Sequence, residues 1–214
     1  MTYIDECRAP DLSDLGTPVL ADYVLNRVFA GAGTPDRKAD SFIILFTLAV
    51  DKAVREYNAG RALLVEYAAS SNRWTLLIES LGRFETCINS AKRALRDVAR
   101  LSSHPDGPEV ERSVRRLLES YGTFITPLRD AIEHMDAKVQ ADRLGDGEAH
   151  SLMVSHDSLY LEIAGNHLAF DQLALLLRRL REVAVELAAY RESDVGCPLL
   201  WYQQKDQCLR LMAS

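Results

Sequence analysis

Hydrophobic residues recur at steps of three and four along most of this chain, which is the spacing that places them on one face of an α-helix. The clearest stripe, over about residues 73–101, consists of Leu77, Leu81, Phe84, Ile88, Ala91, Leu95 and Val98. A similar stripe, over about residues 170–190, consists of Leu173, Leu176, Leu180, Val183 and Leu187. Such long stripes are buried by packing against other long helices, nearly antiparallel. We therefore predict an all-α, up-down helical bundle of about five or six helices.

Capping residues and helix breakers predict the boundaries of the other helices. A first helix covers about residues 18–30 and ends at the glycine- and proline-containing break of residues 31–35. Ser41 can cap a second helix that reaches about Tyr67. A fourth helical segment, over about residues 109–144, follows the turn sequence of residues 104–108, and Gly122 and Pro127 interrupt it.

Pro127 allows two interpretations of this fourth segment. Proline inside a helix removes a hydrogen bond and clashes with the preceding turn, at a cost of about 3 kcal/mol. Either the helix kinks there, or it stops near Tyr121 and a new helix starts with Thr126 as N-cap and Pro127 at the first position. We prefer the second interpretation. It places Arg129 and Asp130 in a first helical turn, where backbone N–H groups point towards a bound phosphate.

The pattern changes before the last helix. Two short apolar runs, residues 151–155 and 158–163, flank the polar pair His156-Asp157, which predicts a small β-hairpin insert near residues 150–163. Asn166-His167 can form a further turn. We divide the chain into an N-terminal lead-in (1–17), a single helical bundle domain (18–192) and a C-terminal tail (193–214). The apolar cluster of the tail is expected to pack on the bundle or on a partner subunit.

Composition narrows the classes of function. The net charge of −6 argues against a general nucleic-acid-binding surface, although it allows a local basic pocket. Arg rather than Lys supplies most of the 25 cationic side chains, and Arg suits bidentate contact with phosphate. The arginines near residues 112–116 and 178–181 are interpreted as charged helix faces, but those of residues 178–181 can line an anion site if the last helix packs near His134.

No targeting segment, membrane span, cofactor or metal site is expected. The first residues are acidic rather than apolar, and the longest apolar run is too short to span a bilayer. The four cysteines lie far apart and form no CxxC pair, so we interpret them as reduced thiols of a cytoplasmic protein. The histidines show no helical spacing of metal ligands.

The candidate chemistry is concentrated in residues 126–140. Arg129 and Asp130 are adjacent, and His134 follows one helical turn after Asp130. An i,i+4 spacing allows the Asp130 carboxylate to accept a hydrogen bond from the His134 imidazole and to fix its tautomer. A helical wheel places Asp130 and His134 away from a buried stripe of Ile125, Leu128, Ile132, Met135 and Val139. Arg129 lies at the edge of this stripe, and its side chain is long enough to reach the same polar face.

The segment Arg129-Asp130-Ala-Ile-Glu-His134 resembles the R-x4-6-H motif of HEPN domains, in which a polar residue follows the arginine. HEPN proteins are helical bundles, and many are metal-independent endoribonucleases of toxin or defence type. The resemblance implies that His134 is the catalytic base for attack by the RNA 2′-OH, that Arg129 stabilises the phosphorane charge and that Asp130 orients the pair. The hairpin insert and the acidic neighbours Glu133 and Asp136 depart from the minimal HEPN pattern.

The resemblance also implies partners. HEPN domains usually act as homodimers with both motifs in one cleft, so a second copy of this chain is an expected partner. RNA and a cognate antitoxin protein are the other partners that the resemblance implies. The alternative is a catalytically silent helical dimerisation or interaction module. In that case Arg129 and Glu133 are an ion pair on a solvated helix face, contributing about 0.2–0.5 kcal/mol.

Overall fold

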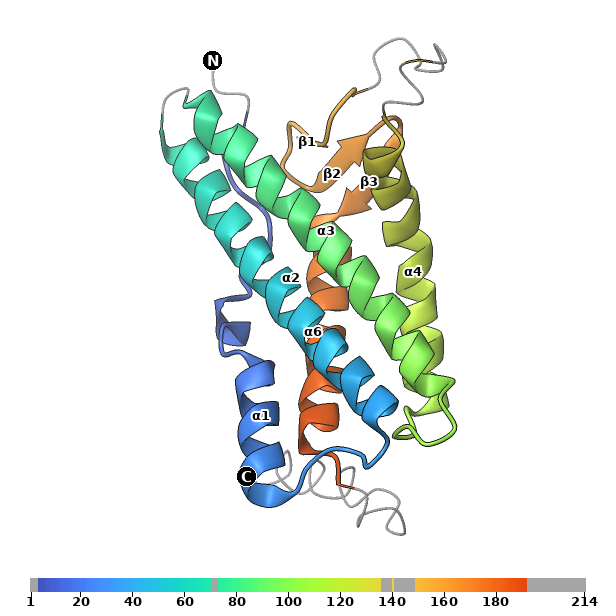
Figure 1. The fold of residues 1–214 in the computed structure, drawn as a ribbon. Helices are drawn as coiled ribbons and strands as arrows, with labels where there is room; N and C mark the ends of the chain where they lie inside the picture. Colours follow the sequence, from blue (N-terminus) through green and yellow to red (C-terminus); the bar gives the residue numbers. More distant parts are fainter. Residues whose placement is uncertain (1–3, 71–72, 136–139, 141–148, 192–214) are drawn as a thin grey trace, which may run out of the picture.

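The computed structural model describes residues 4–70, 73–135, 140 and 149–191 (Figure 1). In these residues the chain forms a bundle of α-helices with a small antiparallel sheet, which confirms the predicted all-α bundle with a hairpin insert. A short 3-10 turn, η1 (Ser13–Leu15), precedes the first helix. The labelled helices are α1 (Val19–Ala30), α2 (Arg37–Ala69), α3 (Trp74–Ser102), α4 (Arg112–Glu133) and α6 (Phe170–Ala189).

The antiparallel pair α2 and α3 forms the long axis of the molecule, and α1, α6 and α4 lie along it (Figure 1). The two long helices approach closely at Gly60, whose carbonyl oxygen accepts a hydrogen bond from Ser80 Oγ at 2.8 Å. Close to this crossing, Arg83 Nη1 donates to the buried Glu56 carboxylate at 3.0 Å. The core continues to α6, where the rings of Phe84 and Phe170 lie 5.1 Å apart.

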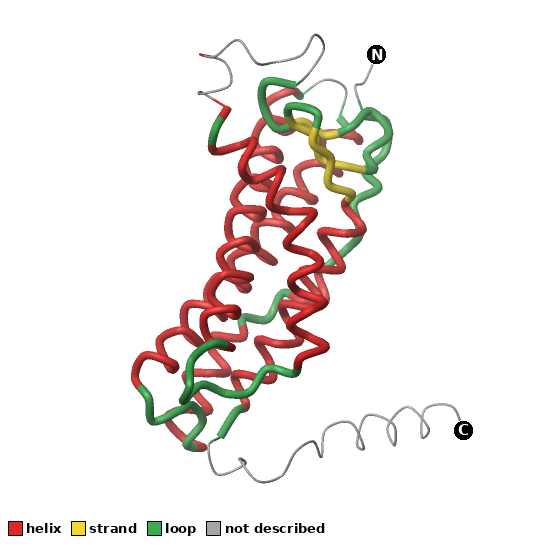
Figure 2. The backbone as a smooth tube through the Cα atoms, turned by 90° about the vertical axis from the view of Figure 1, so that its right-hand side faces the viewer, coloured by secondary structure: helices red, strands yellow, loops and turns green. Residues whose placement is uncertain are grey.

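The sheet lies at one end of the elongated bundle (Figure 2). Its strands β1 (Met153–Val154), β2 (Tyr160–Ile163) and β3 (Asn166–Ala169) pair antiparallel in that order. The β1–β2 pair corresponds to the predicted hairpin, and β3 is an addition to it. The prediction of a turn at Asn166-His167 is wrong, because the chain reverses at Ala164 and Gly165, whose φ angles are 47° and 73°. The third strand pairs fully with β2 and leads directly into α6.

The second helix begins earlier than Ser41. Asp36 is the N-cap, and its carboxylate accepts hydrogen bonds from the N–H groups of Lys38 and Ala39 at 2.9 and 2.7 Å. These hydrogen bonds, first of all the one from Ala39, lower the pKa of Asp36. Ser41 instead lies inside the first turns and donates its hydroxyl to Arg37 O. The predicted Ser41 cap is therefore wrong by five residues.

Helix α4 passes through Pro127 without stopping. The preferred interpretation, a restart with Thr126 as N-cap, is wrong, and Arg129 lies near the end of a helix rather than at its start. Ile125 and Leu128 on either side of the proline are fully buried, so packing holds both halves of α4 against the core. The helix ends at Glu133; most of the predicted continuation to Leu144 lies outside the described residues.

The lead-in is closely packed on α2. Ile4 and Leu12 are fully buried. Tyr57 donates its hydroxyl to Pro10 O at 3.0 Å, and Arg61 Nε donates to Ala9 O at 2.8 Å. The predicted tail 193–214 lies outside the described residues. No helix in the described part of the chain combines the length and the apolar character needed to cross a bilayer.

Candidate functional site

The predicted motif lies at the last turn of α4, next to the end of the bundle that carries the sheet (Figure 1). Arg129 and Asp130 are on the helix, and His134 is its C-cap residue. The side chains of Arg129 and Asp130 are 30% and 47% exposed, and His134 is exposed as well. Because Ile125 and Leu128 are buried on the other face, the polar set is directed outward as the helical wheel predicts.

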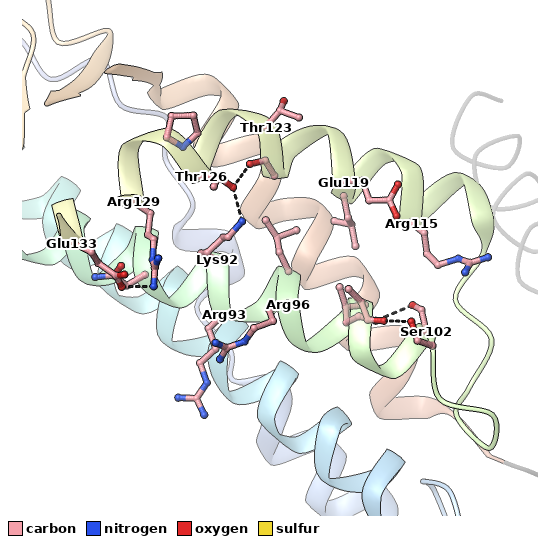
Figure 3. A pocket seen from close by; sticks show the side chains of 18 residues that line it. Lys92, Arg93, Arg96, Ser102, Arg115, Glu119, Thr123, Thr126, Arg129 and Glu133 are labelled. Carbon is pink, nitrogen blue, oxygen red and sulfur yellow. Dashed lines mark hydrogen bonds and ion pairs between the residues drawn. The ribbon is translucent and has the colours of Figure 1, made fainter. Parts of the chain in front are cut away.

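Arg129 is held by two carboxylates of its own helix. Its Nη1 lies 3.1 Å from Asp130 Oδ1. Its Nη2 pairs with Glu133 Oε1, a contact that is drawn in Figure 3. A guanidinium group has five N–H donors, so these two contacts leave others for a ligand. In this structure the Asp130 carboxylate therefore forms an ion pair with Arg129 rather than a hydrogen bond with His134.

The predicted Asp130–His134 side-chain hydrogen bond is not present among the contacts of the described residues. The His134 backbone N–H donates to Asp130 O at 3.0 Å and closes the final turn of α4. The backbone then leaves helical geometry, with φ −109° and ψ 15° at His134. The imidazole is thereby removed from the regular i,i+4 position that the wheel assumes.

An open groove of about 1020 Å³ runs between α3 and α4, and Arg129 and Glu133 line one end of it (Figure 3). Five cationic side chains line the groove, against the two carboxylates of Glu119 and Glu133. The cations are Lys92, Arg93, Arg96, Arg115 and Arg129. This excess of positive charge occurs in a chain whose net charge is −6. The groove is thus a locally cationic surface on an acidic protein.

One hydrogen bond crosses the groove and links its two walls. Lys92 Nζ on α3 donates to Thr126 Oγ1 on α4, and this hydroxyl donates in turn to Gly122 O (Figure 3). Asn89 Oδ1 and Arg115 Nε, also in the lining, are buried without a hydrogen-bond partner among the described residues. Such unpaired polar atoms are rare in folded proteins, and ordered water commonly satisfies them.

The helical pattern contained a signal for part of this site. Arg93 and Arg96 fall between the apolar positions of the α3 stripe, so they had to be on its outward face. The pattern does not indicate that α4 lies beside this face of α3, because the pairing of the two helices depends on tertiary packing. Arg115 was interpreted as part of an ordinary charged face and instead lines the groove.

The other candidate residues have structural contacts. Arg178 pairs with Asp14 at 2.6 Å, and neither Arg178 nor Arg181 is in the lining of the groove. Asp157 accepts hydrogen bonds from Ser155 Oγ and the Leu159 N–H, which lower its pKa and form the β1–β2 turn. Within the described residues, His, Cys, Asp and Glu side chains form no group that could hold a metal ion.

Comparison of the chain with protein-family models, with curated proteins and with solved structures found no match. Function is therefore inferred from the chemistry of the α3–α4 groove and of the motif at its end.

Proposed function

We propose that this protein is a HEPN-like, metal-independent endoribonuclease of toxin or defence type. The observation that carries the proposal is the position of Arg129 at one end of a cationic groove in an otherwise acidic chain. Positive charge in the groove attracts the phosphates of RNA. His134, five residues after Arg129, is exposed and supplies an imidazole, the side chain that most often serves as a general base.

The proposed reaction needs a base and a fixed positive charge. Neutral His134 takes the proton of an RNA 2′-OH, and the 2′ oxygen attacks the adjacent phosphorus. The bond from phosphorus to the 5′ oxygen breaks, and the leaving 5′ oxygen takes up a proton, which leaves a 2′,3′-cyclic phosphate. Arg129 stabilises the extra negative charge of the phosphorane. Asp130 and Glu133 orient the guanidinium through the contacts described above.

The proposal includes a homodimer in which a second copy completes the cleft, with RNA as substrate and a cognate antitoxin as regulator. We place its action in the cytoplasm, where the thiols of Cys7 and Cys87 stay reduced.

Cleavage of a mixed RNA pool in the presence of EDTA tests the proposal. Wild-type protein is expected to give fragments with 2′,3′-cyclic phosphate ends, and His134→Ala is expected to lower the rate by about 10²-fold or more. His167→Ala is the matched control, because His167 is also exposed but lies on β3, outside the Arg129–His134 motif. Fragments that persist in His134→Ala, or that EDTA abolishes, would rule out this mechanism.

A second function, a catalytically silent dimerisation module, is favoured by one feature of α1. Its outer face exposes four large apolar side chains: Val24, Leu25, Val28 and Phe29, the last being 83% exposed. Apolar side chains grouped in this way often mark a protein–protein contact. Two results together would favour this module over the ribonuclease. The folded wild-type protein would leave RNA intact, and light scattering would show a wild-type dimer that the substitution Phe29→Glu converts to monomers.

A further inference from the structure

A second open groove, of about 810 Å³, lies on the other side of α3. The start of α2 contributes Lys38 and Phe42 to its lining, and the end of α3 contributes Arg96 and Arg100. His104 completes one wall, with its ring 6.5 Å from that of Phe42 in an edge-on arrangement. No carboxylate lines this groove in the described residues. The nearby Asp36 lies 3.6 Å from His104 Nε2 and caps α2.

The two grooves adjoin over the outer surface of α3. Arg96, Ala99 and Ser103 line both of them. Along α3 the first groove extends from Asn89 to Ser103, which is about 21 Å at the helical rise of 1.5 Å per residue. Cationic side chains therefore continue from Arg129 on α4, over α3, to Lys38 at the start of α2.

A buried carboxylate positions the arginines between the grooves. Asp97 is 1% exposed and lies 3.7 Å from a nitrogen of each of Arg93, Arg96 and Arg100. For Arg93 and Arg96 that nitrogen is Nε, so the two terminal nitrogens are directed elsewhere. Within the described residues these terminal nitrogens have no hydrogen-bond partner, and the side chains are 51% and 54% exposed. Paired terminal nitrogens are the part of arginine that binds phosphate bidentately.

The shape of this surface favours a flexible strand over a duplex. A ligand that occupies both grooves has to bend over one α-helix, which is about 10 Å wide. Double helices resist bending on this scale, since their persistence length is about 50 nm for DNA. A single strand bends freely, and its unpaired bases can stack on an aromatic side chain such as Phe42. At about 3.4 Å per stacked nucleotide, the α3 segment alone matches about six nucleotides.

We infer that the two grooves form one track for single-stranded RNA, defined by Lys38, Phe42, Arg93, Arg96, Arg100 and Arg129. The inference rests on the proposed function. It specifies that the RNA substrate of the proposed reaction is unpaired, and that the strand runs from the Arg129–His134 motif over α3. Binding to the track can nevertheless be measured without cleavage.

The test is fluorescence anisotropy with labelled single-stranded RNA of about 12 nucleotides, enough to occupy both grooves. The full chain carries His134→Ala, so that the probe stays intact. Arg96→Gln/Arg100→Gln is expected to weaken binding by about 10- to 30-fold and to reduce the slope of log K against log salt by about 1.4, the value for two lost phosphate contacts. Lys38→Gln, which leaves the Asp97 cluster intact, is expected to weaken binding by about 3- to 5-fold.

Arg73→Gln/Arg179→Gln is the matched control. It also removes two exposed arginines, but neither lines a groove, so the affinity is expected to stay within about 2-fold. The track would be overturned if the control, Lys38→Gln and Arg96→Gln/Arg100→Gln variants bound the single-stranded RNA with equal affinity. It would also be overturned if duplex RNA bound as tightly as the single strand. Binding without any cleavage by protein with native His134 would refute the ribonuclease alone. Cleavage that the Arg96/Arg100 variant leaves unchanged would refute the track alone.

Discussion

Gly60 and Gly82 both lie inside long helices, but only Gly60 faces another helix at close range. A Cβ at Gly60 would lie 3.1 Å from Arg83 Cβ and 3.2 Å from Ser80 O, whereas a Cβ at Gly82 would meet nothing within 4 Å. Alanine is favoured over glycine in a helix by up to about 1 kcal/mol, and overpacking costs about 1–3 kcal/mol. We therefore expect Gly82→Ala to raise the free energy of unfolding by up to about 1 kcal/mol. Gly60→Ala should lower it by up to about 2 kcal/mol.

Urea unfolding of the two variants side by side measures this difference. The comparison is internally controlled, because the change in helix propensity is the same at both positions. If Gly60→Ala stabilised the protein as much as Gly82→Ala, α2 and α3 would have to separate easily. The Ser80–Gly60 hydrogen bond and the adjacent Arg83–Glu56 ion pair argue against that.

For helices and strands, the sequence predicts the structure well where buried residues recur at a regular helical spacing. The stripe from Leu77 to Val98 predicts α3 closely, because each of its positions faces the same core. Prediction failed where a local signal competes with tertiary packing. Ser41 and Thr126 are good caps by residue type, but Asp36 caps α2 instead, and α4 continues through Thr126 and Pro127 with Ile125 and Leu128 both buried. The cationic track was equally hidden, since its residues come from three helices.

Pro127 tests whether tertiary packing holds α4 together against a local helix-breaking signal. Its ring occupies an exposed position inside α4 and removes the N–H that would donate to the carbonyl of Thr123. Pro127→Ala restores this donor, so we expect the free energy of unfolding to rise by about 1–3 kcal/mol. Pro105→Ala, at an exposed turn, is the control and should lower it by about 0.4–1 kcal/mol through the more flexible unfolded chain. Loss of stability in Pro127→Ala would mean that the core requires a bend at this point.

For the whole molecule, charge is distributed unevenly and function is proposed from that distribution. The net charge of the chain is −6, whereas the linings of the two grooves beside α3 contain more cationic than acidic side chains. The sequence shows part of this separation, because the second half of α3 contains Lys92, Arg93, Arg96 and Arg100 with Asp97 as the one carboxylate among them. The cations that α2 and α4 add to the grooves can be placed only when the three helices lie side by side.

The N-terminal lead-in packs on α2, so we expect it to unfold together with the helical bundle. Leu12 comes before the first helix and is fully buried, and the carbonyl of Leu12 accepts a hydrogen bond from Asn58 on α2. We expect Leu12→Ala to lower the free energy of unfolding by about 2–5 kcal/mol, the usual cost of a leucine cavity in a core. Leu25→Ala, at a 54% exposed position of α1, is the control and should change it by about 0.5 kcal/mol or less. Both are measured by urea unfolding followed by circular dichroism. A Leu12→Ala effect as small as that of Leu25→Ala would make the lead-in a separable arm, whereas a large effect makes it a part of the bundle that fixes the position of α2.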